Sequence, residues 1–168
     1  MSKTLAFFFL FCGFFSHAQT PGFQRLTIED GLSQGMIFDL LQSRDGFLWI
    51  ATKDGLNRYD GYNFKLYATD PFNPFSLAEN TVTALFEDSR GWLWVGLESK
   101  GLDVFDPRTG RFYHFPLSLG DNNTFGGSNI IRVRQTPDGA IWVIKSGGSL
   151  LQITIPPGWK NELPDVPN

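Results

Sequence analysis

Short runs of apolar residues recur along most of this chain, and turn-forming residues interrupt every run. The runs are four to six residues long and are rich in Val, Ile, Phe, Tyr and Trp, which favour β-strands. Apolar stretches of ten or more residues with helical spacing are absent beyond residue 18. The pattern therefore predicts an all-β protein built from short strands and tight turns.

The same stretch of sequence occurs three times, which indicates a repeat protein. Each copy places a glycine three residues before a tryptophan: Gly46 and Trp49, Gly91 and Trp94, Gly139 and Trp142. The second tryptophan follows the first by 45 residues, and the third follows the second by 48. In the second copy, strands A to D are predicted at 82–87, 92–97, 102–105 and 111–115. Four antiparallel strands per about 45 residues is the period of a β-propeller blade.

The predicted fold class is all-β, a partial β-propeller of about three four-stranded antiparallel blades with the third incomplete. The predicted segments are a strand at 23–28, blade 1 at 36–67, blade 2 at 81–115, partial blade 3 at 129–155 and a proline-rich irregular tail at 156–168. Closed propellers contain about four to eight blades. We therefore expect the ring to be completed by C-terminal blades of a longer parent, encoded beyond codon 168, or by self-association.

The first 18 residues are predicted to be a signal peptide that precedes the fold. Lys3 stands before the apolar run Leu5–Phe15, and Ser16 and Ala18 supply small residues where a signal peptidase reads the chain. The 11 apolar residues of this run are too few to cross the hydrocarbon of a bilayer as a helix. We expect cleavage after Ala18 and export to the periplasm.

Charge and composition exclude nucleic-acid binding and argue against a metal site. The chain has 14 Lys and Arg against 17 Asp and Glu, and no basic cluster. Its one cysteine, Cys12, lies in the predicted signal peptide. His114 is the only histidine beyond residue 18. A metal site requires several converging ligands, so we predict neither metal nor cofactor, and an ordinary strand position for His114.

The repeat resembles the two-component regulator propeller repeat. The resemblance rests on an acidic turn and glycine, then Leu/Ile-Trp-Ile/Val, then Gly-Leu and an aromatic-Asp pair, and on the segments 23–34 and 54–61. It covers roughly 23–155, and the third copy departs from it at Ile144 and Lys145. Membership would imply the periplasmic sensor region of a hybrid two-component histidine kinase, of a Bacteroidetes type that often responds to oligosaccharides.

The sequence contains no kinase motif. We therefore expect any kinase activity, and the membrane span, to belong to the part of the longer parent protein that is absent from this sequence. Adjacent carboxylates such as Glu87 and Asp88 lie at predicted turns, where Asp caps backbone amides. We therefore predict no catalytic residues and a non-enzymatic sensor fragment that binds a glycan-like ligand. The alternative is a free-standing, secreted, lectin-like module that closes its propeller by self-association.

Topology predicts which surface would bind the ligand. In an up-and-down blade, the B–C loops and the D–A linkers, here 68–80 and 116–128, share one face. The candidate ligand-binding residues on this face are Lys53, Asp54, Glu98, Lys100 and Lys145. The three repeat tryptophans occupy one position in strand B, which favours packing between blades over the stacking of sugars on indole faces.

Overall fold

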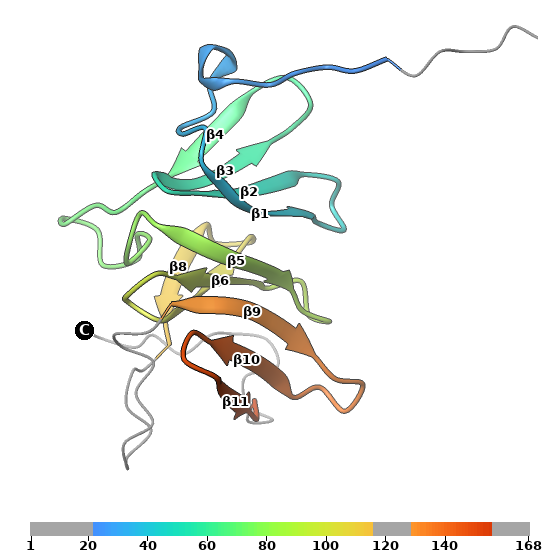
Figure 1. The fold of residues 1–168 in the computed structure, drawn as a ribbon, viewed down its shortest axis with the longest axis vertical. Coiled ribbons are helices and arrows are strands. Elements are labelled where there is room, and N and C mark those ends of the chain that lie inside the picture. Colours follow the sequence, from blue (N-terminus) through green and yellow to red (C-terminus); the bar gives the residue numbers. More distant parts are fainter. Residues whose placement is uncertain (1–21, 116–128, 156–168) are drawn as a thin grey trace, which may run out of the picture.

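The computed structural model of the chain describes residues 22–115 and 129–155, which form three antiparallel sheets (Figure 1). Blade 1 contains β1 (Ile37–Gln42), β2 (Leu48–Thr52), β3 (Gly55–Tyr59) and β4 (Phe64–Tyr67). Blade 2 contains β5 (Val82–Glu87), β6 (Leu93–Leu97), β7 (Leu102–Asp106) and β8 (Arg111–His114). Blade 3 contains β9 (Ile130–Gln135), β10 (Ile141–Lys145) and β11 (Ser149–Ile153). Strands pair in chain order within each sheet, which confirms the predicted fold class.

The first strands of the three blades lie side by side, with β5 between β1 and β9 (Figure 1). Each carries a bulge at the same repeat position, where Phe38, Thr83 and Ile131 interrupt the pairing register. A bulge bends a strand and increases its twist. The repeated bulge therefore gives each blade the same curvature at its innermost strand.

The turn after each first strand is also repeated, and it explains the glycines of the sequence pattern. Gly46, Gly91 and Gly139 have φ angles of 91°, 85° and 91°. These values lie in the left-handed region, which only glycine adopts without a steric penalty. The turn is closed by a backbone hydrogen bond at the same place in each copy: Ser43 to Phe47, Asp88 to Trp92, and Thr136 to Ala140, with lengths of 2.9, 3.0 and 3.0 Å.

Trp49 is 2% exposed and lies in the apolar core between blades 1 and 2. Its ring is 5.2 Å from the ring of Phe105 in blade 2 and 5.6 Å from that of Tyr67. Its indole N–H donates to the hydroxyl of Ser43 at 3.2 Å. Trp49 therefore packs against the neighbouring blade, and its ring face is not available to a ligand.

Trp94 occupies the equivalent position between blades 2 and 3 and is fully buried. Its indole N–H donates to the carboxylate of Asp88 at 3.0 Å. Gly96, two residues later, allows blade 3 to approach closely, because an added Cβ atom would lie 2.7 Å from Cγ2 of Ile130. The interface between blades 2 and 3 therefore depends on the large side chain of Trp94 and on the absence of a side chain at Gly96.

Trp142 differs from the other two repeat tryptophans because it is only half-buried. It lines an open hollow of about 360 Å³ on the side of blade 3 that faces away from blade 2, together with Arg132, Arg134, Thr136, Ile144 and Leu150. Ile144, which takes the place of Gly96, is 39% exposed, and Leu150 is 59% exposed. We call this surface the Trp142 face.

The strand predicted at 23–28 is not present. Residues 22–27 pair with none of the eleven described strands, and Ile28–Asp30 form a short 3-10 helix, η1. A strand requires a hydrogen-bonding neighbour, and these residues have no such neighbour in the described part of the chain. The segment is instead attached through its end, where Leu32 is buried and Asn57 donates its amide to the hydroxyl of Ser33 at 2.7 Å. The predicted signal peptide, linker 116–128 and tail 156–168 lie outside the described residues.

We expect Gly96→Ala to lower the free energy of unfolding by about 1–3 kcal/mol, the usual cost of overpacking a core. The added methyl group would clash with Ile130 and with Ala84. Urea unfolding followed by tryptophan fluorescence measures the change. Gly35→Ala is the matched control, because no atom lies within 4 Å of its added Cβ atom. Equal stability of both variants would contradict the close packing of blades 2 and 3.

Candidate functional site

One repeated hydrogen bond shows that the B–C loops and the linkers lie at the same end of the blades. Lys53 donates its backbone N–H to the carbonyl of Met36, Glu98 to Thr81, and Ser146 to Asn129, at 3.2, 3.1 and 2.8 Å. In each blade the acceptor lies directly before the first strand, where the linker enters. We call the surface formed by the three B–C loops and linker 68–80 the linker face.

Four of the five predicted ligand-binding residues are exposed on the linker face: Lys53, Asp54, Glu98 and Lys100. The fifth, Lys145, was predicted to lie in a loop but is the last residue of β10 and is 9% exposed. Side chains alternate along a strand, so Lys145 points to the same side as Ile141 and Val143, which pack against blade 2. Its aliphatic stem permits this burial, and Lys145 is therefore not part of the exposed surface.

The end of the linker fixes the conformation of both neighbouring loops. The Glu79 carboxylate accepts hydrogen bonds from the backbone N–H groups of Ser99 and Lys100, at 2.7 and 2.9 Å. The carbonyl of Asn80 accepts a hydrogen bond from the N–H of Gly55 at 2.7 Å, next to Asp54. The predicted residues of blades 1 and 2 are thus brought together through the linker between them.

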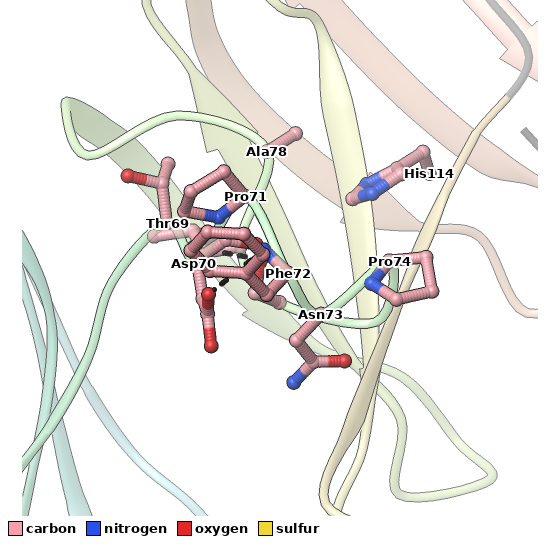
Figure 2. Close-up of a pocket in the computed structure, with 10 residues that line it drawn as sticks. Thr69, Asp70, Pro71, Phe72, Asn73, Pro74, Ala78 and His114 are labelled. Carbon is pink, nitrogen blue, oxygen red and sulfur yellow. Dashed lines mark hydrogen bonds between the residues drawn. The ribbon is translucent and has the colours of Figure 1, made fainter.

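The linker also forms the wall of a pocket of about 380 Å³, which sequence analysis did not identify (Figure 2). Its lining consists of linker residues and one residue of β8: Thr69, Asp70, Pro71, Phe72, Asn73, Pro74, Ser76, Leu77, Ala78 and His114. Phe72 is 94% exposed at this pocket. Two local turns shape the wall, since the side chain of Asp70 accepts the N–H of Phe72 at 2.9 Å and that of Asn73 accepts the N–H of Phe75 at 3.0 Å.

A buried acid–base pair supports this pocket. Asp103 on β7 is 1% exposed, and its Oδ1 atom lies 2.8 Å from Nδ1 of His114. Its other oxygen accepts the N–H of Ala78 at 2.9 Å. Burial raises the pKa of the Asp103 carboxyl, and the hydrogen bond from His114 opposes that rise. The hydrogen bond to Asp103 raises the pKa of His114, while burial of the ring acts in the opposite direction.

His114 is therefore more than an ordinary strand residue. The two residues of the pair are direct partners in the β7–β8 register, so the predicted hairpin of strands C and D contained the signal that could have found it. The pair alone lacks the members of a metal site: no three His, Cys, Asp or Glu side chains converge in residues 22–115 and 129–155. In the same residues, no helix has the length and apolar character of a membrane span.

Comparison with known proteins finds a family model that matches parts of the first two sequence repeats. The family model for the two component regulator propeller matches residues 31–54 and 76–99. A protein named histidine kinase P4, from Formosa agariphila, is 43% identical over 56 residues. That segment is 33% of this chain and 4% of the relative, so the chain corresponds to a small part of the relative's length.

Two solved structures share the fold. The extracellular domain of a B. thetaiotaomicron protein described as a hybrid two component system superposes with a TM-score of 0.71 and 24% identity, over 79% of this chain and 19% of that chain. A second extracellular domain from B. thetaiotaomicron, described as that of a one component system, gives a TM-score of 0.58 and 22% identity, over 73% and 15%. At this level of identity the likeness concerns the arrangement of blades.

We expect Glu79→Ala to release the β6–β7 loop, because Ser99 and Lys100 would lose the carboxylate that accepts their N–H groups. Amide hydrogen exchange at these two residues should accelerate, with a loss of about 1 kcal/mol in global stability. Glu98→Ala is the control, since it removes an exposed carboxylate from the same loop. Unchanged exchange in the Glu79 variant would show that the loop is held by other contacts.

Proposed function

Because two segments of this chain match the two component regulator propeller, we propose that its blades form part of the ligand-sensing region of an exported two-component receptor. In this proposal the chain recognises a ligand and carries out no reaction itself. Signal output belongs to a histidine kinase elsewhere in the parent protein. The similar proteins support this assignment, since one is named a histidine kinase and another is the extracellular domain of a hybrid two component system.

We propose an oligosaccharide as the ligand and the pocket of the linker face as its contact region. Sugars present C–H faces that stack on aromatic rings, and hydroxyl groups that bind planar polar side chains. The pocket offers both, with an aromatic ring that is 94% exposed at Phe72 and polar groups at Thr69, Asp70 and Asn73. The exposed Phe72 is the observation that carries this proposal, because an apolar ring in water gains from stacking on a ligand.

The rival function is a lectin-like module that closes its ring with a second copy. The exposed Trp142 face favours it, since the equivalent faces of blades 1 and 2 are covered by the next blade. Light scattering on the purified chain separates the two functions. A discrete dimer that holds its mass on dilution would support the rival, and a monomer would reject it.

The ligand proposal is tested by titrating the purified chain with a panel of neutral and acidic oligosaccharides in a calorimeter. We expect Phe72→Ala to weaken binding by about two- to tenfold, in line with the loss of one aromatic contact of about 0.5–1.5 kcal/mol. Tyr62→Ala is the matched control, because Tyr62 is 89% exposed in the β3–β4 turn, away from the pocket. Equal affinity of both variants would place any binding outside the pocket, and a panel without a single binder would reject an oligosaccharide ligand.

A further inference from the structure

We propose that the ligand site extends from the pocket across Asn80 to Asp54 in the β2–β3 loop, so that it takes a chain of sugar units and not a single sugar. The extension rests on the proposed function, because it assigns a longer ligand to the same pocket. Asn80 is the positioning residue of this site, since its side chain connects Thr69 in the pocket wall with Asp54.

The amide side chain of Asn80 makes one hydrogen bond to each part of the site. Its Oδ1 atom accepts the backbone N–H of Thr69 at 2.8 Å, and its Nδ2 atom donates to Oδ1 of Asp54 at 3.3 Å. Only this orientation of the amide satisfies both partners, because a backbone N–H can only donate and a carboxylate can only accept. A single amide group therefore separates the pocket wall from the carboxylate of Asp54.

The pocket wall is fixed by its own hydrogen bonds. The hydroxyl of Ser76 accepts the N–H of Asp70 at 2.9 Å and donates to the carbonyl of the same residue at 3.1 Å. Asn73 lies inside the loop closed in this way. Its N–H donates to the carbonyl of Asp70 at 3.1 Å, and its carbonyl accepts the N–H of Ser76 at 3.0 Å. Phe72 is thus presented on a preformed loop, which lowers the cost of ordering the site when a ligand binds.

The loop that carries Asp54 is fixed as well. The N–H of Asp54 donates to the hydroxyl of Thr52 at 3.1 Å, and this hydroxyl donates to the carbonyl of Gly55 at 2.8 Å. The N–H of Gly55 donates to the backbone carbonyl of Asn80 at 2.7 Å. Asp54 is exposed, and within the described part of the chain only its Oδ1 atom accepts a hydrogen bond. Its second oxygen can therefore accept a hydroxyl group of a ligand.

The arrangement sets the direction in which a ligand continues. Figure 2 shows Thr69 and His114 on opposite sides of the pocket, with Phe72 between them in this view. His114 belongs to β8 of blade 2, whereas Thr69 follows the end of β4 by two residues and leads back to blade 1. A sugar unit that stacks on the ring of Phe72 leaves Asp54, beyond the Asn80 amide, for a second unit.

The experiment titrates the purified chain in a calorimeter with neutral gluco-, galacto- and manno-oligosaccharides of graded length, down to the single sugars. We expect a chain of units to bind more tightly than its single sugar. Asp54→Ala should weaken binding of the longer ligand by about three- to tenfold, the effect of one hydrogen bond, and leave the single sugar unchanged. Phe72→Ala should weaken both.

Glu98→Ala is the matched control, because it removes an exposed carboxylate from the same face in the β6–β7 loop, away from Asn80. Equal affinity for single sugars and longer chains would overturn the extended site, and so would an effect of Glu98 in place of Asp54. A series without any binder rejects the proposed function and the extension together. Binding that does not depend on ligand length rejects the extension alone.

Two variants of Asn80 test its positioning role. Asn80→Ala removes both side-chain hydrogen bonds and keeps the backbone carbonyl, so amide exchange should accelerate at Thr69 while Gly55 stays protected. Asn80→Asp keeps an oxygen that accepts the N–H of Thr69 but places a second negative charge beside Asp54. In that variant Thr69 should stay protected, and the tighter binding of longer ligands should be lost. Unchanged affinity for longer ligands in both variants, or equal exchange at Thr69 in both, would overturn the role of Asn80.

Discussion

Packing between neighbouring blades is the interaction on which the rest of this structure depends. A four-stranded antiparallel sheet has two faces, and each blade buries an apolar face only by placing it against the next sheet. Trp49 and Trp94 fill these interfaces, and Ala51 and Gly96 beside them allow the first strand of the following blade to approach. Hydrogen bonds between blades also fix how one blade is oriented against the next. For example, the carboxylate of Asp39 in β1 accepts the N–H of Leu85 in β5 at 2.8 Å.

The linker face is a consequence of this stacking. Because blades 1 and 2 each consist of four antiparallel strands, each begins and ends at the same end of its sheet. The linker between them therefore passes over the B–C loops of both blades before it enters β5. Glu79 and Asn80 use that passage to fix both loops. The outer part of the same linker is tied to β8 at Phe75, and linker residues on both sides of this attachment line the pocket. The scaffold is thus rigid where blades meet, and the candidate binding groups lie on the segment that connects them.

Much of the fold could be read from the sequence because the repeat carries local signals. The turn glycines require positive φ angles, and short runs of apolar residues mark buried strands such as β5 and β6. The strand expected at 23–28 and the loop position expected for Lys145 were wrong for a shared reason. An apolar segment becomes a strand only where another strand is available to pair with it. The residue at which a strand ends depends on the strands beside it. Neither can be read from the segment alone.

The sequence by itself determined the number of blades, their strand order and the end of the blades at which loops and linker meet. It did so because turns and strand patterning are set by neighbouring residues. Only the tertiary structure decided that Asp103 and His114 form a buried pair, that Phe72 stands exposed beside a pocket, and that Trp142 is half-exposed while its two counterparts are buried. These features depend on which surfaces come into contact across the fold. Such contacts determine how deeply each side chain is buried, and burial determines the free energy of placing a charge or an aromatic ring there.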